Sequence, residues 1–168
     1  LEDVRQLATD RDIVLIFDEC TSGFRQAFGG LHKCYGVEPD MAVFGKTLGN
    51  GYAISAVIGC REVMEAAQST FISSTFWTER IGPAAALKTL EVMERERSWE
   101  RITETGHDIG RRWQALAEKH DLPIQINGLP ALIGFSFPVP DMLKYKTLIT
   151  QEMLKKGYLA ATSVYVCT

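Results

Sequence analysis

A lysine and an aspartate each follow a short apolar run of the kind that forms a strand. Asp18 comes directly after residues 13–17, and Lys46 follows residues 41–44 after one glycine. Ligands of open α/β sheets gather at the carboxyl ends of the strands, so the two side chains share one edge if the strands are neighbours. A partly desolvated lysine can attack a carbonyl, and a carboxylate is the natural partner of a pyridinium nitrogen. The pair suits Schiff-base chemistry, although such residues are more often only solvated loop positions.

The apolar runs around this pair predict three strands of a sheet. Residues 13–17 have no polar alternation, which is typical of a strand buried on both faces of a parallel sheet. Residues 41–44 and 54–58 predict the next two strands. The turn signal at residues 49–51 then places Lys46 in a tight loop between these two strands.

Helical spacing dominates the rest of the chain. Helices are predicted at the start of the chain over residues 1–8, at 62–68, from Pro83 onwards, at about 98–119 and at 145–156. Short strands are predicted at 124–126, 131–137, 158–161 and 164–167, and residues 70–80 are expected to be irregular. This order predicts an α/β domain followed by a small α+β unit, with the boundary after Arg97.

Composition excludes several classes of function. The 168 residues are 46% hydrophobic and 23% charged, which indicates a globular protein, and the net charge of -3 provides no basic field for nucleic acid. No apolar run approaches the roughly 20 residues that cross a bilayer, so we expect no membrane partner and a cytoplasmic location. No metal site or disulfide framework is indicated by the wide spacing of the cysteines, which are Cys20, Cys34, Cys60 and Cys167. Surface or helix roles are expected for the histidines, which are His32, His107 and His120.

Two segments make a family resemblance recognisable. LIFDECTSGFR at residues 15–25 and YGVEPDMAVFGKTLGNGYAISAVIG at residues 35–59 resemble the class III, or subgroup II, pyridoxal-phosphate aminotransferases, which include the glutamate-1-semialdehyde aminomutases. The resemblance implies the aspartate-aminotransferase-like fold type I. Residues 1–97 would be the C-terminal part of the cofactor-binding large domain, and residues 98–168 a small C-terminal domain, incomplete at its end. Because the chain begins at Leu1 without a methionine, we expect a partial chain that lacks the N-terminal half.

The resemblance assigns roles to individual residues. Lys46 matches the lysine that forms the Schiff base with pyridoxal 5'-phosphate and moves the substrate proton, and Asp18 matches the aspartate paired with the pyridine nitrogen. Cys20 stands where the family has a valine packed against the ring. Thr21 stands where many members have a glutamine near the phenolic oxygen. Thr75 matches the threonine that reaches the phosphate of the neighbouring subunit.

The chain departs from the family pattern just after Thr75. Residues 77–80 are Trp, Thr, Glu and Arg, where relatives usually have small residues and an Asn-Pro pair. Arg80 could bind a substrate carboxylate or pair with Glu79 in the loop, and the loop pair is the favoured interpretation.

The predicted function is transfer of an amino group between an amine or amino acid and a keto acid or aldehyde. The same lysine and aspartate would also serve an aminomutase, which returns the amino group to one carbon skeleton, and a non-catalytic member of the fold is a further alternative. A nucleotide-binding module is disfavoured because no GxGxxG or Walker motif follows a strand. The resemblance implies a homodimer for the full-length protein. We expect the 168 residues alone to be inactive, because the family's N-terminal half supplies the phosphate cup.

Overall fold

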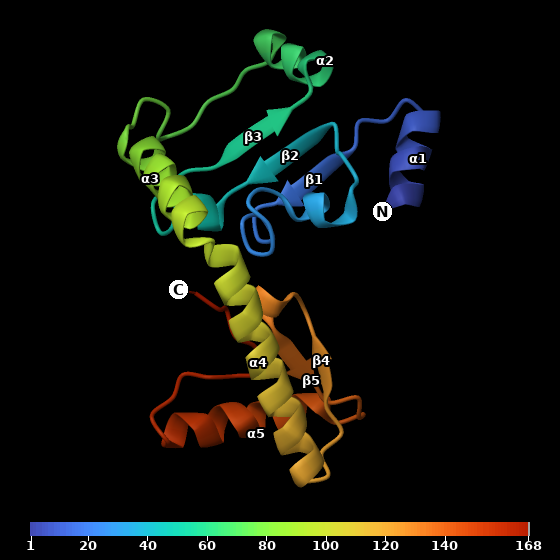
Figure 1. The fold of residues 1–168 in the computed structure, drawn as a ribbon, viewed down its shortest axis with the longest axis vertical. Helices are drawn as coiled ribbons and strands as arrows, with labels where there is room; N and C mark the ends of the chain where they lie inside the picture. The colour runs from blue at the N-terminus through green and yellow to red at the C-terminus, as the bar shows by residue number, and fades with distance from the viewer. Residues whose placement is uncertain (168) are drawn as a thin grey trace. The chain divides into compact units, whose positions relative to one another are not determined.

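The computed structural model describes residues 1–167, which form parts of two compact units. Unit 1 is Leu1–Trp99 and unit 2 is Glu100–Thr168, so the division falls near the start of helix α4, Ser98–Lys119 (Figure 1). Thr168, the last residue of the predicted 98–168 domain, lies outside the described residues. The assignment of residues 1–97 to a large domain and of residues 98–168 to a small one stays a prediction.

Unit 1 contains a three-stranded sheet in the order β1, β2, β3. The strands are Ile16–Glu19, Met41–Phe44 and Ala56–Gly59, and β1 runs parallel to β2 whereas β3 runs antiparallel to it. The three arrows of Figure 1 show these directions. The predicted loop between the second and third strands is confirmed, because the short 3-10 helix η2, Lys46–Leu48, connects them.

The first strand differs from its prediction in place and in burial. It begins at Ile16 and extends through Asp18 to Glu19, and Ile13 and Ile16 are 57% and 53% exposed. The expectation of a strand buried on both faces is therefore wrong for this chain. The shift has a local cause, because the Leu15 amide donates to the Asp40 carboxylate at 2.7 Å just before the strand begins.

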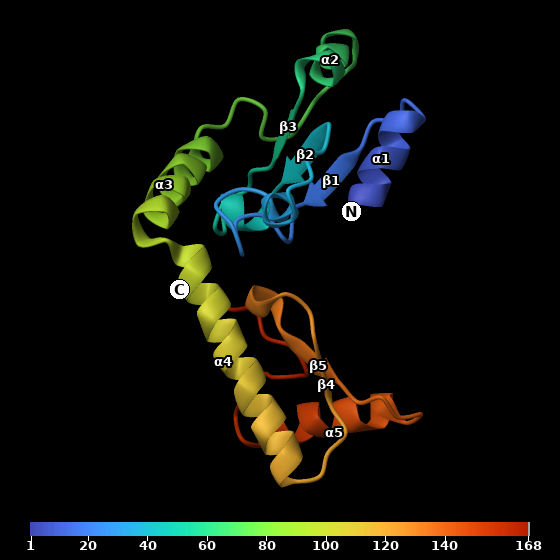
Figure 2. The same cartoon turned by 45° about the vertical axis from the view of Figure 1, so that its right-hand side comes forward.

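Helices flank the sheet of unit 1 on different sides. Helix α1, Glu2–Asp10, lies on the β1 side in both views, and helix α3, Ile81–Glu96, lies near η2 (Figures 1 and 2). The 3-10 helix η1, Leu31–Tyr35, leads into β2, and α2, Arg61–Met64, with η3, Glu65–Ser69, follows β3. Residues 70–80 are irregular, as predicted.

The core of unit 1 joins the sheet to α3. Side chains alternate along a strand, so Ala42 and Phe44 lie on the same face of β2. They form a buried cluster with Leu48 of η2 and Ala86 of α3. This packing holds η2, and with it Lys46, against the carboxyl end of β2.

Unit 2 packs helix α4 against a two-stranded antiparallel sheet. Strands β4, Gln125–Asn127, and β5, Gly134–Ser136, are separated by the 3-10 helix η4, Pro130–Leu132, and α5, Met142–Lys155, follows. Contact between α4 and η4 is close, because a Cβ atom at Gly106 would lie 1.9 Å from the Pro130 carbonyl oxygen.

The predicted C-terminal strands are confirmed in part. Residues 131–137 contain β5 and the end of η4, whereas residues 158–161 and 164–167 contain no strand, and the isolated bridge between those two ranges joins Ser163 to Gly134. Val164 and Val166 do donate to the carbonyl oxygens of Ile133 and Ala131, at 2.8 and 2.9 Å. Because η4 bends that partner segment, these bonds do not extend into a regular ladder.

Candidate active site

The parallel pairing of β1 and β2 brings the aspartate and the lysine to one edge of the sheet. Asp18 is paired with Val43, Glu19 is paired with Phe44, and both strands end at that second pair. Lys46 follows Phe44 after a single residue. The predicted shared edge is therefore present.

Lys46 has an unusual backbone conformation. Its φ is +38°, in the left-handed region that residues other than glycine seldom adopt. Strain of this kind persists only where neighbouring contacts over-determine the conformation, and it is common at functional sites. Here the Leu48 amide donates to the Gly45 carbonyl at 2.9 Å, the Asn50 amide donates to the Lys46 carbonyl at 3.1 Å, and Leu48 is buried in the core.

The side chain of Lys46 is exposed and directed at the loop that follows β1. Its Nζ donates a hydrogen bond to Thr21 Oγ1. The two loops approach closely, because a Cβ atom at Gly45 would contact Cys20 Sγ at 3.4 Å. The amine, the thiol and the hydroxyl therefore lie together.

Asp18 is held in its ionised form. Its Oδ1 accepts a hydrogen bond from the Cys20 amide at 3.0 Å. That bond, a further one from the Cys20 side chain and the positive charge of Lys46 lower the pKa of Asp18. Asp18 and Lys46 are thus near enough to interact electrostatically.

Cys20 is half-buried between these two groups. Burial raises the pKa of its thiol, and the neighbouring Asp18 carboxylate raises it further. The side chain is therefore a neutral thiol and behaves as a small apolar group. Its packing role against a cofactor ring stays a prediction.

A buried network behind this edge is not anticipated by the sequence analysis. Glu19 is only 4% exposed, and its carboxylate accepts hydrogen bonds from Ser22 and His32. Burial raises the pKa of Glu19, but the bonds from Ser22 and from the amides of Leu31 and His32 outweigh it, and the net shift is downward. Surface or helix roles are expected for the histidines, and His32 does lie in the 3-10 helix η1, but it is buried and not at the surface. The missed signal is strand alternation, which sends Glu19 to the opposite face from Asp18.

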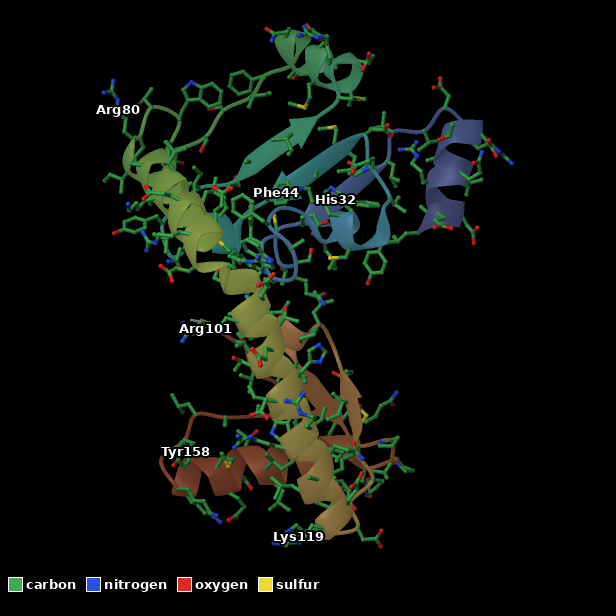
Figure 3. All side chains as sticks on the ribbon, viewed as in Figure 1. His32, Phe44, Arg80, Arg101, Lys119 and Tyr158 are labelled. Atoms are coloured by element: carbon green, nitrogen blue, oxygen red, sulfur yellow. The ribbon has the colours of Figure 1, made fainter. Side chains whose placement is uncertain are left out.

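Thr75 and Arg80 lie in a different environment. Both are exposed in the irregular segment 70–80, and the Thr75 hydroxyl has no hydrogen-bond partner among residues 1–167. Glu79 accepts hydrogen bonds from the amides of Ile81 and Gly82, so the loop pair expected between Glu79 and Arg80 is not present in the described part of the chain. Figure 3 shows the Arg80 side chain pointing away from the ribbon. The structure does not bring either residue to Lys46.

Among residues 1–167, no helix has the length and apolar character needed to cross a bilayer. The described histidine, cysteine, aspartate and glutamate side chains form no group of three or more that could hold a metal ion.

Sequence comparisons identify relatives of the chain. It is 40% identical over 152 residues to 3-aminobutyryl-CoA aminotransferase of Cloacimonas acidaminovorans (strain Evry), covering 90% of this chain and 37% of the relative. It is 29% identical over 180 residues to glutamate-1-semialdehyde 2,1-aminomutase of Methanocaldococcus jannaschii, covering 99% and 42%. The chain therefore spans about two fifths of the length of these relatives.

A solved structure and a family model agree with this relationship. The PLP internal aldimine form of the Sphingopyxis sp. MTA144 FumI protein matches with a TM-score of 0.88 and 25% identity, over 96% of this chain and 39% of that one. The predicted fold class, part of the fold type I architecture, is confirmed. The model of the family described as aminotransferase class-III matches residues 1–165. The predicted family is thus confirmed, and the chain belongs to the class-III aminotransferases.

Proposed function

We propose that the protein transfers an amino group between an amine or amino acid and a keto acid or aldehyde, with pyridoxal 5'-phosphate as cofactor. The observation that carries this proposal is the placement of Asp18 and Lys46 on one sheet edge, where their charges interact. Membership of the class-III aminotransferase family supports it.

The chemistry of the two groups fits the cofactor. Pyridoxal phosphate carries an aldehyde and a ring nitrogen on one pyridine ring, and an amine and an ionised carboxylate are the groups that bind them. Lys46 would hold the cofactor covalently through Nζ, and Asp18 would bind the ring nitrogen. Cys20, half-buried between them, presents a small neutral side chain to the ring. The bound cofactor supplies an electron sink for the carbanion formed at the substrate carbon.

Each residue has a separate task in this proposal. Asp18 remains ionised because its pKa is lowered, so it keeps the ring nitrogen protonated. Lys46 is exposed, so its amine is accessible to a carbonyl group. When its amine is free, Lys46 would take a proton from the substrate α-carbon through Nζ and deliver it to the bound cofactor. The Thr21 hydroxyl orients that amine by accepting its hydrogen bond.

The remaining roles rest on the exposed segment 70–80. We propose that Thr75 donates to the cofactor phosphate of the neighbouring subunit in a homodimer, and that Arg80 binds a substrate carboxylate. The exposure of both side chains supports this, as does the absence of a partner for the Thr75 hydroxyl among residues 1–167. A hydroxyl and a guanidinium are suitable donors to phosphate and carboxylate anions.

An aminomutase is the second candidate, because glutamate-1-semialdehyde 2,1-aminomutase is among the relatives. The two candidates differ in what they consume. A transaminase needs an amine donor and a separate acceptor, whereas an aminomutase converts one substrate without a co-substrate. A substrate screen of the full-length protein separates them. It tests glutamate 1-semialdehyde alone, and it tests amino donors paired with keto acids. A β-amino acyl-CoA thioester is included among the donors, because one relative is named for such a substrate.

The first test is covalent capture of the cofactor. The full-length protein is mixed with pyridoxal phosphate, the visible absorption band is recorded, borohydride is added and the labelled peptide is identified by mass spectrometry. We expect one label, on Lys46, and none in Lys46→Ala. Lys33→Ala is the matched control, because Lys33 is also an exposed lysine of unit 1. Full labelling of Lys46→Ala at another lysine would refute the proposal.

A further inference from the structure

We propose that Glu19 is a positioning residue for Lys46. Its buried carboxylate binds both ends of the loop that follows β1. It thereby keeps the Thr21 hydroxyl within hydrogen-bond distance of the lysine amine. This inference rests on the proposed function, because it assigns a cause to the placement of the cofactor-binding amine.

The first end of the loop is bound through Ser22. Ser22 Oγ donates to Glu19 Oε2, and the Gly23 amide donates to the Glu19 carbonyl oxygen at 2.9 Å. The chain therefore turns back on itself within a few residues of the strand end. A side chain at Gly23 has no room, since its Cβ would lie 2.7 Å from the Glu19 carbonyl oxygen and 2.7 Å from Phe44 Cδ1.

The second end of the loop is bound through His32. The His32 amide and its Nδ1 each lie 3.1 Å from Glu19 Oε1, so both groups are bonded to the same carboxylate oxygen. The imidazole is buried, with its ring centroid 5.9 Å from that of Phe17. Gly30 makes the approach possible, because a Cβ there would lie 2.3 Å from the imidazole and 2.9 Å from Glu19 Oε1.

The loop held in this way carries the partner of Lys46. Thr21 lies between Cys20 and Ser22, and its hydroxyl accepts the hydrogen bond from Lys46 Nζ. The Thr21 carbonyl is fixed as well, because Arg25 Nε donates to it at 2.6 Å. If Glu19 releases Ser22, the turn can relax, and the Thr21 hydroxyl can leave the amine.

Asp40 provides a matched comparison in the same unit. Its carboxylate likewise accepts hydrogen bonds from a backbone amide and from a side chain, here from Leu15 at 2.7 Å and from Arg5 at 2.9 Å. It lies just before β2, at the opposite end of that strand from Lys46. A merely structural role of Glu19 predicts that the two carboxylates have the same influence on the lysine.

The experiment compares Glu19→Gln and Asp40→Asn in the full-length protein. Two quantities are measured: the melting temperature, and the rate at which the apoprotein develops the visible band of lysine-bound pyridoxal phosphate. We expect both variants to melt at a lower temperature. Glu19→Gln should slow capture about tenfold, as the loss of a charged buried hydrogen-bond acceptor implies, and Asp40→Asn should stay within about twofold of wild type.

Two Ser22 variants provide a second comparison, which tests the inference even if Glu19→Gln does not fold. Ser22→Ala loses the hydroxyl and should slow capture, whereas Ser22→Thr keeps it and should restore the rate. Equal capture rates in Glu19→Gln and Asp40→Asn, or in Ser22→Ala and Ser22→Thr, would overturn the inference. Failure of the wild-type protein to capture the cofactor at Lys46 would instead refute the proposed function.

Discussion

The edge around Lys46 and the irregular segment 70–80 are both predicted to bind the cofactor. They differ in the contacts that their side chains make within unit 1. At the edge, Asp18, Cys20 and Lys46 each interact with a neighbour from the same unit. In segment 70–80, Phe71 is 94% exposed, and the hydroxyl of Thr75 has no partner among the described residues. The side chains at the sheet edge are thus positioned by contacts within unit 1, whereas Thr75 is exposed and unit 1 holds its side chain less firmly.

The largest expected difference between the two regions is in kcat, which should fall in a variant of the edge and not in a variant of segment 70–80. Asp18→Asn keeps the shape of the side chain and an acceptor for the Cys20 amide, but it removes the charge that holds the ring nitrogen protonated. We expect kcat to fall about 100-fold or more, which is typical when a preorganised electrostatic contact is lost. Covalent capture at Lys46 should remain, and mass spectrometry after borohydride reduction checks this.

Thr75→Val is the matched variant in the exposed segment. It removes one hydroxyl donor to the phosphate, so the Kd of the cofactor should rise about tenfold while kcat changes little. Spectroscopic titration and steady-state kinetics of both variants distinguish the regions. A loss of kcat in Thr75→Val equal to that in Asp18→Asn would remove the contrast between them.

The same contrast explains which features could be predicted from sequence. The shared edge of Asp18 and Lys46 follows from two apolar runs and the rule that ligands meet at strand ends. Strand alternation indicates only that Glu19 leaves the face of Asp18. Its partner could not be predicted, because the His32 amide donates to Glu19 from 13 positions away, across a loop without regular structure. The apolar residues 164–167 resemble a strand, but Val164 and Val166 bond to a segment that η4 bends, and no regular ladder forms. Residues 158–161 also resemble a strand, but the Tyr158 amide donates to the Met153 carbonyl at the end of α5.

The loop under Lys46 should tolerate a methyl group poorly at Gly30. A Cβ there would overlap the imidazole of His32, so Gly30→Ala should lower the free energy of unfolding by about 1–3 kcal/mol, as overpacking does. Gly36→Ala is the control, because Gly36 has φ +65° and open space around its Cβ position. Its cost should come from the left-handed backbone and amount to about 1–2 kcal/mol.

The two glycine variants should differ in their effect on the lysine. Gly30→Ala displaces His32 from Glu19 and should slow capture of pyridoxal phosphate, whereas Gly36→Ala should leave the rate unchanged at comparable stability. Denaturant unfolding and absorbance kinetics measure the two effects. Equal capture rates in both variants would show that the geometry at Lys46 does not depend on this loop.

The smallest expected effect separates two neighbours at the end of segment 70–80. Glu79 accepts hydrogen bonds from the amides of Ile81 and Gly82, which lack partners of their own in the first turn of α3. Glu79→Ala should therefore lower the free energy of unfolding by about 1 kcal/mol, as loss of a helix cap does. Arg80→Ala removes an exposed side chain and should change stability by less than about 0.5 kcal/mol. If Arg80 binds a substrate carboxylate, the KM for an acidic substrate should rise in Arg80→Ala and stay constant in Glu79→Ala. Thermal unfolding and steady-state kinetics of the two variants therefore assign Glu79 to the helix and Arg80 to the substrate.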